Sequence, residues 1–300
     1  MKILITGATG FIGQKLTKLF IDNAIFVHYL TTSKDKIESK PFYQGFYWNH
    51  DEGKIDENCF IGVDVIIHLA GANIAHRWTK TYKQEVIESR VLTANLLFNA
   101  LKKNPHQVKQ IISASGTAIY PDSSTKIYDE TETQFADGFL SNVVIKWEES
   151  ADQFKLLNIK VCKLRTGIVY ANNGGALAEI IKPIKFGFGA SFGSGQQVQS
   201  WIHLTDVVNM YYFLATNNLE GTFNAVAPEK TTDEKLTKAI AKILKKPLFL
   251  PNIPRFVMQL ILGDMCELLF TNKNISSKKI IDAGFKFQFP ELNGALEDIL

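Results

Sequence analysis

Residues 3–13 of this 300-residue chain read ILITGATGFIG, and this stretch decides the fold. The apolar start predicts a short buried strand, and a helical pattern follows the glycines. Gly7 allows a sharp turn out of the strand, Gly10 leaves bare backbone open to a ligand, and Gly13 allows the helix to pack closely on the sheet. Strand, glycine turn and helix in this order predict a Rossmann fold that binds a dinucleotide.

The start of the expected helix supplies a site for a diphosphate. Its first backbone N–H groups have no partner within the helix, and with the helix dipole they attract a phosphate. The alternative is a chance cluster of glycines in a loop, which the flanking strand and helix disfavour. We therefore expect cofactor contacts from Gly7, Thr9, Gly10, Phe11, Ile12 and Gly13.

The end of the second expected strand, 26–30, bears on which dinucleotide binds. An NAD site usually places an acid there to hold the ribose 2′-hydroxyl. Residues 31–34 read TTSK, and no acid appears before Asp35. Hydroxyls and a lysine suit a 2′-phosphate better, unless these residues simply begin a solvated turn. We expect NADP rather than NAD, with contacts from Thr31, Thr32 and Lys34.

Apolar runs alternate with helical patterns through the first half of the chain. Near-continuous apolar strands of this kind suit a parallel sheet covered on both faces, so an open, doubly wound α/β sheet is expected. The longest helical pattern carries an apolar stripe at Ile87, Val91, Ala94, Phe98 and Leu101. The expected strands are residues 3–6, 26–30, 63–69, 110–113 and 159–164.

The second half is expected to add a smaller, mainly helical lobe. One more strand is predicted at 221–227, and helical patterns dominate from Pro228 onward. The glycine-rich run 187–195 is either a mobile flap over a substrate or a set of tight turns. We expect a Rossmann domain at 1–170 and 203–227, and a substrate-side lobe at 171–202 and 228–300.

Composition excludes several classes of protein. The formal net charge is +3 and the basic residues are spread along the chain, so no nucleic-acid partner is expected. No stretch of about 18 apolar residues predicts a membrane span, and residues 256–270 indicate an amphipathic helix instead. The three cysteines are far apart, which predicts neither disulfides nor a metal site. The initial apolar run is too short for a signal peptide, so we expect a cytoplasmic protein.

Further motifs give the chain a resemblance to the extended short-chain dehydrogenases/reductases. These are residues 7–13, Leu69-Ala70-Gly71-Ala72, Ser113-Ala114-Ser115 and the run LRTGIV at 164–169. More narrowly, the chain resembles the atypical epimerase-family branch, also described as nucleoside-diphosphate-sugar-epimerase-like. That likeness extends from end to end of the chain and includes Arg77-Trp78, Lys146-Trp147-Glu148, Gly193-Ser194-Gly195, Trp201-Ile202-His203 and Ala283-Gly284-Phe285.

The resemblance implies an NADP-binding Rossmann domain and a small C-terminal domain that shapes a substrate cleft. One departure is Thr32, where the family often has Arg, so Lys34 would have to compensate as a less well-defined point charge. From the residues alone, the small side chains at 70–71 could also reflect tight packing, and Arg90 could form a surface salt bridge. The implied additional cofactor contacts are Leu69, Ala70, Gly71, Glu85, Arg90 and Val169.

The resemblance also directs attention to catalysis. Active members of the superfamily pair a Tyr with a Lys four residues later, but none of the nine tyrosines here is followed by Lys at that spacing. Ser115 occupies the place expected for the substrate-positioning hydroxyl. Tyr120 could supply the missing phenol, or be a packed loop residue. Arg165, Trp201 and His203 are expected to line or buttress the cleft.

Two hypotheses about function therefore remain open. The first is an NADP-dependent oxidoreductase or epimerase acting on a sugar nucleotide or a small carbonyl compound, with Ser115 and Tyr120 as candidate catalytic residues. The second is a non-catalytic NADP(H)-binding sensor or scaffold, which the absent Tyr-Lys pair favours. In either case we expect a monomer or a homodimer.

Overall fold

A mostly parallel sheet forms the centre of the protein, as the alternation of strands and helices predicts. The computed structural model describes residues 1–172 and 174–300. The nine-stranded sheet has the order β13-β9-β7-β6-β1-β2-β4-β3, and β5 pairs with β4. Its strands are β1 (Lys2–Thr6), β2 (Phe26–Thr31), β3 (Ser39–Lys40), β4 (Tyr43–Asn49), β5 (Lys54–Ile55), β6 (Val65–His68), β7 (Gln110–Gly116), β9 (Lys160–Thr166) and β13 (Gly221–Ala225).

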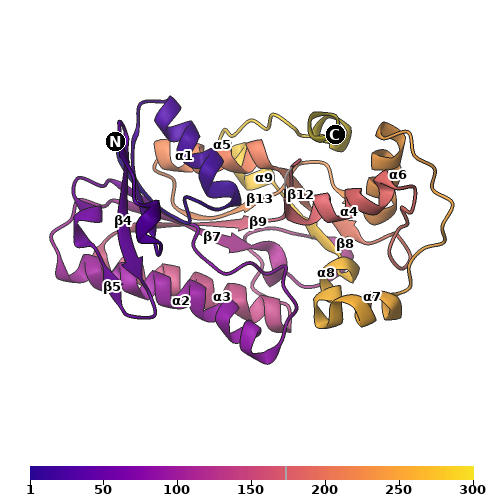
Figure 1. Cartoon of the computed structure of the whole chain (residues 1–300), viewed down its shortest axis with the longest axis horizontal. Helices are drawn as coiled ribbons and strands as arrows, with labels where there is room; N and C mark the ends of the chain where they lie inside the picture. The colour runs from indigo at the N-terminus through magenta and orange to yellow at the C-terminus, as the bar shows by residue number, and fades with distance from the viewer. Residues whose placement is uncertain (173) are drawn as a thin grey trace.

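Helices cover both faces of this sheet, so the Rossmann prediction is confirmed. Figure 1 shows α1 (Phe11–Asp22) and α5 (Leu204–Thr216) on one face, and α2 (Lys80–Lys103) and α3 (Phe139–Asp152) on the other. Side chains of β1 alternate between the two cores. Ile3 and Ile5 pack in the same core as Leu16 of α1. Leu4 packs in the opposite core with Leu97 of α2.

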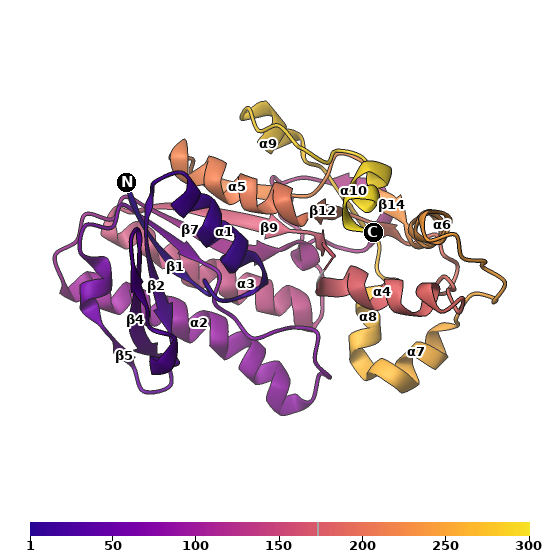
Figure 2. The same ribbon diagram turned by 45° about the horizontal axis from the view of Figure 1, so that its top comes forward.

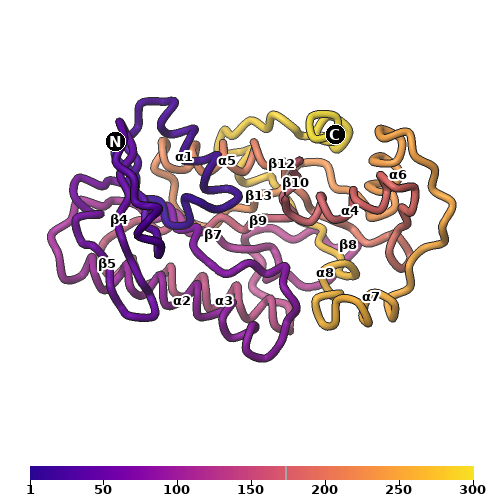
Figure 3. The backbone as a smooth tube through the Cα atoms, viewed as in Figure 1, coloured from indigo at the N-terminus to yellow at the C-terminus, as the bar shows by residue number. Residues whose placement is uncertain are grey.

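A mainly helical lobe lies beyond one end of the sheet. Figure 2 shows α4, α6, α7 and α8 gathered there, while α9 and α10 lie along the side that carries α5. The tube in Figure 3 shows that a long connection leads from α6 to α7 around the outside of this lobe. The helices are α4 (Gly175–Lys185), α6 (Asp233–Ile243), α7 (Arg255–Leu262), α8 (Glu267–Phe270), α9 (Lys278–Asp282) and α10 (Leu292–Ile299).

Three short two-stranded sheets lie outside the main sheet among the described residues. β10 and β12 pair in parallel, β11 and β14 pair antiparallel, and β15 pairs in parallel with β8. In residues 1–172 and 174–300, no helix has both the length and the apolarity to cross a bilayer. The strands are β8 (Ser123–Tyr128), β10 (Ile168–Tyr170), β11 (Val198–Gln199), β12 (Trp201–His203), β14 (Thr231–Thr232) and β15 (Lys273–Ile275).

The structure corrects two of the helical predictions. On α2, the fully covered face runs through Val86, Arg90 and Leu97, whereas Ile87 and Val91 are only half-buried. Because α2 packs against both the sheet and α3, its buried face is turned around the helix axis relative to the predicted apolar stripe. The helix predicted over 256–270 is interrupted at Gly263, which has a φ of +61° and separates α7 from a 3₁₀ turn and α8.

Packing of α1 on the sheet should dominate the stability of the N-terminal half. Leu16 is completely buried, whereas Leu156 in the 3₁₀ turn Gln153–Leu157 is 79% exposed. We expect Leu16→Ala to lower the free energy of unfolding by about 2–5 kcal/mol, because it leaves a cavity under α1. The matched variant Leu156→Ala should change it by less than about 0.5 kcal/mol. Urea denaturation measures both, and equal losses would contradict this account of the core.

Candidate functional site

The glycine loop after β1 is shaped to bring backbone close to a ligand. Gly7 has a φ of +71°, and the Gly10 N–H donates to the Gly7 carbonyl at 2.9 Å. A Cβ on Gly13 would lie 2.1 Å from that carbonyl oxygen, which no side chain can tolerate. Gly10 is the N-cap of α1 and has no side chain with which to occupy the first amides of the helix. Those amides remain available to an anion.

The carboxyl end of β6 lies directly beside this loop. The Thr6 hydroxyl accepts the N–H groups of Leu69 and Ala70, each at 3.1 Å. It also shares a 2.8 Å hydrogen bond with Nδ1 of His68, whose other ring nitrogen lies 3.3 Å from the Thr93 hydroxyl. Burial lowers the pKa of His68 to about 4, so the imidazole is neutral at physiological pH. Sequence reasoning missed Thr6 and His68, and the Thr6 hydroxyl holds the predicted residues Leu69 and Ala70 against the glycine turn.

Arg90 is buried next to the same segment. It donates to the carbonyls of Val86 at 2.8 Å and Ala72 at 3.1 Å, and its guanidinium carbon lies 4.7 Å from the centre of the Trp147 ring. Among the described residues it forms no ion pair with a carboxylate, so the surface salt bridge considered above is not made. Burial lowers the pKa of Arg90 to about 10, so it stays charged at neutral pH. Glu85 is exposed on the same helix.

The predicted contacts Thr31, Thr32 and Lys34 lie at the end of β2 and just after it. β1 and β2 pair in parallel with Thr6 opposite Leu30, which places residues 31–34 next to the glycine loop. The Thr31 hydroxyl is buried and accepts the Ser33 N–H at 3.2 Å. Thr32 and Lys34 are exposed, and the Lys34 ammonium lies 5.1 Å from the centre of the Tyr47 ring.

Phe11 and Val169 come together at the start of α4. A Cβ on Gly174 would lie 3.2 Å from the Phe11 ring, and a Cβ on Gly175 would lie 3.1 Å from the Val169 carbonyl oxygen. The glycines at 174–175 therefore allow the end of β10 to approach the first turn of α1. These contacts bring the predicted segments of β1, β2, β6 and β10 together at the carboxyl edge of the sheet.

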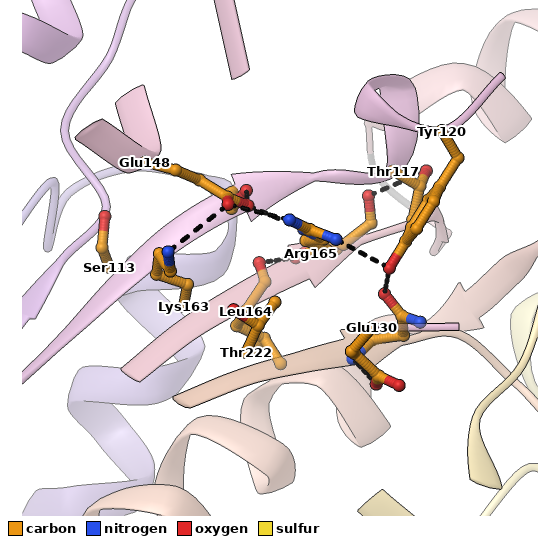
Figure 4. Close-up of polar contacts among 12 residues, drawn as sticks. Ser113, Thr117, Tyr120, Glu130, Glu148, Lys163, Leu164, Arg165 and Thr222 are labelled. Carbon is orange, nitrogen blue, oxygen red and sulfur yellow. Dashed lines mark hydrogen bonds and ion pairs between the residues drawn. The ribbon is translucent and has the colours of Figure 1, made fainter. Parts of the chain in front are cut away.

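The two candidate catalytic residues belong to a buried polar network, part of which is drawn in Figure 4. The Ser115 hydroxyl donates to the Glu148 carboxylate at 2.6 Å. Arg165 donates to both oxygens of Glu148, at 2.7 and 2.9 Å, and to the Tyr120 hydroxyl at 2.9 Å. The Tyr120 hydroxyl in turn donates to Asn224 at 2.8 Å. The network thus joins β7, α3, β9 and β13 through the interior.

Electrostatics keeps the members of this network in fixed protonation states. Burial disfavours the charge on Glu148, but the hydrogen bonds from Arg165 and Ser115 outweigh it and lower the pKa of the carboxyl. Burial raises the pKa of Tyr120 to about 12, although Arg165 opposes the shift. The phenol is completely buried and therefore remains a protonated hydrogen-bond donor at neutral pH. Ser115 is 4% exposed.

Sequence reasoning did not connect these residues. Glu148 was noted only as part of a motif, yet an arginine on a near-continuous apolar strand is itself a signal that a buried acid lies nearby. His203 has a separate position: its Nδ1 accepts the Thr205 N–H at 3.2 Å and caps α5, and its Nε2 lies 3.3 Å from Asp298. In the described part of the chain, His, Cys, Asp and Glu side chains form no cluster able to hold a metal ion.

The Glu148–Arg165 pair should be essential to stability. Glu148→Gln leaves the buried guanidinium without its counter-charge, so we expect the free energy of unfolding to fall by about 3 kcal/mol. The neighbouring exposed residue provides a matched control, and Glu149→Gln should have almost no effect. Chemical denaturation at neutral pH measures the difference, and similar losses for both variants would contradict the pairing.

The same pair predicts a pH dependence with a definite sign. The pKa of Glu148 in the folded protein lies below the ordinary value of 4.5, so the unfolded chain takes up this proton first as the pH falls. The stabilisation is therefore complete above pH 4.5 and is lost as the pH falls below it. We expect the stability difference between wild type and Glu148→Gln to shrink over this range. A difference that stays constant down to pH 3 would argue against the assignment.

Comparison with known protein families gives two matches. Residues 3–227 match the NAD dependent epimerase/dehydratase family, and residues 253–299 match a domain of unknown function, DUF1731. The mouse epimerase family protein SDR39U1 is 32% identical over 305 residues, covering 100% of both chains. An epimerase family protein of Staphylococcus aureus is 34% identical over 302 residues, covering 99% of this chain and 98% of its own.

Solved structures agree with this picture. The crystal structure of human epimerase family protein SDR39U1 (isoform 2) with NADPH has a TM-score of 0.86 at 30% identity, covering 100% of this chain and 99% of that one. MoeE5 in complex with UDP-glucuronic acid and NAD has a TM-score of 0.80 and covers 99% of this chain and 97% of its own. Because MoeE5 is only 18% identical to this chain, its similarity supports the fold alone.

Proposed function

The chain belongs to the NAD dependent epimerase/dehydratase family, and on that premise we propose that it binds NADP(H) and acts as an oxidoreductase or epimerase. The observation that carries the proposal is the open N-terminus of α1 beside a second strand that ends without an acid. The human relative with NADPH supports the same cofactor. The substrate class would be a sugar nucleotide or a small carbonyl compound.

The residues at the carboxyl edge of the sheet fit a phosphorylated dinucleotide. The cradle between Gly7 and Gly13 is space that a side chain would fill, which suits a diphosphate against backbone amides. Lys34 and the hydroxyl of Thr32 would face the 2′-phosphate. In the described part of the chain, the buried Nε of Arg90 has no hydrogen-bond partner, so this guanidinium has donor capacity left for the cofactor.

In this proposal the cofactor would supply the hydride chemistry, and the chain would bind and orient the cofactor and the substrate. Leu69, Ala70 and Gly71 would border the cofactor on the β6 side, and Val169 on the β10 side, with Glu85 near the start of α2. The segments 171–202 and 228–300 would form the substrate side of the cleft. Ser115 would position a substrate oxygen, and Tyr120 would donate a proton, provided that each is released from its present hydrogen bond.

The buried network favours a second candidate function. Tyr120 is completely enclosed and hydrogen-bonded on both sides, and the chain has no Tyr-Lys pair to replace it. A protein built this way could bind NADP(H) tightly without turning over a substrate. It would then serve as a sensor of the NADPH/NADP⁺ ratio or as a scaffold.

Cofactor preference is the first test. We expect the Kd of the purified protein for NADPH to be lower than its Kd for NADH by about tenfold or more, because Lys34 attracts only the phosphorylated ribose. Gly13→Val should abolish binding of both, since its side chain would collide with the Gly7 carbonyl. Gly294→Val is a suitable control, because a side chain at Gly294 meets no atom within 4 Å. Isothermal titration calorimetry measures the affinities; tighter binding of NADH would refute the NADP assignment.

Turnover separates the two candidate functions. NADPH absorbance is followed against a library of carbonyl compounds, with Ser115→Ala and Tyr120→Phe as variants. For sugar nucleotides, product formation is followed by chromatography, because an epimerase returns the hydride to its substrate and leaves the NADPH absorbance unchanged. The enzyme hypothesis expects turnover in the wild type and a loss of about 100-fold or more in kcat in at least one variant, since general acid–base groups contribute on this scale. Tight NADPH binding with no turnover on any compound would instead support the non-catalytic binder.

A further inference from the structure

Tyr29 of β2 is a buried side chain that the cofactor site described above does not use directly. It is 1% exposed, and its ring stacks on Tyr43 of β4 with the centroids 4.3 Å apart and the planes 11° from parallel. Its hydroxyl donates to the Lys36 carbonyl at 2.6 Å and accepts the Glu38 N–H at 2.8 Å. One side chain in the sheet therefore holds residues 36–38, which lie outside it.

Gly45 of β4 leaves the room that the Tyr29 ring and hydroxyl require. A Cβ on Gly45 would lie 2.5 Å from both the hydroxyl and the adjoining ring carbon of Tyr29, so only glycine fits there. The Gly45 N–H also donates to the Glu38 carbonyl at 2.8 Å. Glycine weakens a strand because it has no side chain to pack. Its presence here is explained by the space that the tyrosine ring requires.

The stretch that Tyr29 holds begins at Lys36, the last residue of the turn that carries Lys34. This 3₁₀ turn, Lys34–Lys36, begins three residues after the end of β2, and the Thr31 hydroxyl closes its beginning through the Ser33 N–H. Tyr29 closes its end. Between these two attachments Lys34 leaves the turn with its ammonium over the Tyr47 ring, a second aromatic side chain of β4.

A lysine at position 34 binds a phosphate better if the backbone of its turn is held in place. An arginine presents a rigid, planar set of donors to a phosphate, whereas a lysine is a point charge on a flexible stem. The charge is useful to a ligand only if the backbone that carries it is already in place, because ordering a loop on binding costs affinity. Thr32 offers no guanidinium, so this chain depends on where the turn places Lys34.

We propose that Tyr29 is a positioning residue for NADP specificity: its hydroxyl holds the Lys34–Lys36 turn so that Lys34 meets the 2′-phosphate. This inference rests on the proposed NADP site. It predicts that the tyrosine hydroxyl affects NADPH and not NADH, although it is too deeply buried to touch either cofactor. A residue that merely stabilised the fold would affect both to the same degree.

The test is Tyr29→Phe, which keeps the stacked ring and removes only the hydroxyl. We expect its Kd for NADPH to rise about three- to tenfold, the range for one or two lost hydrogen bonds, and its Kd for NADH to stay within about twofold of wild type. Tyr170→Phe is the matched control, because it removes another buried hydroxyl that is hydrogen-bonded, to Gln199 at 3.2 Å. It should leave the ratio of the two Kd values unchanged.

A double-mutant cycle tests the route through Lys34. In a Lys34→Ala background, Tyr29→Phe should have no further effect on NADPH affinity, since the charge it positions is gone. An equal effect in both backgrounds would overturn the inference and leave the NADP proposal intact. So would an unchanged NADPH/NADH ratio in Tyr29→Phe when the wild type prefers NADPH. If the wild type shows no such preference, the NADP proposal and this inference fail together.

Discussion

The close approach of α1 to the end of β1 is the constraint on which the rest of the structure depends. The Gly13 position lies so near the Gly7 carbonyl that even a methyl group has no room. This contact aims the first amides of α1 along the carboxyl edge of the sheet. The ends of β2 and β6 converge on the same edge because their strands run parallel to β1. The edge can hold an elongated anion for this reason, before any particular side chain is considered.

A second constraint operates at the ends of β7 and β9. A guanidinium buried in the sheet requires a counter-charge, and Arg165 finds it in Glu148 of α3. Once this pair is formed, the hydroxyls of Ser115 and Tyr120 are drawn into its hydrogen bonds. The two candidate catalytic residues are thereby joined to the interior of the domain. The polar network gives the region rigidity, and it explains why these hydroxyls are not simply free groups in a cleft.

The sheet and its flanking helices could be predicted well because they depend on local patterns. The strands at 3–6, 26–30, 110–113 and 159–164 were all recognised from short apolar runs, and the resemblance to the epimerase-family branch is confirmed. β4 was missed because Gln44 and Gly45 interrupt its run of strand-forming aromatics, and the glycine is explained only by the Tyr29 ring beside it. The rotated face of α2 was missed because the helix is covered from two sides, by the sheet and by α3.

Taken alone, the sequence determined the glycine turn, the alternation of strands and helices expected of a Rossmann domain and the acid-free end of β2. Each of these features depends on residues that are close together in the sequence, in the same turn, strand or helix or in the one next to it. Only the tertiary structure decided which groups Ser115, Tyr120, Arg90 and Tyr29 contact. The partners of Tyr120 lie 45 and 104 residues away along the chain, and no local period relates them. A buried polar group takes whichever partner the packing brings within reach, so its role follows from the folded arrangement of the strands.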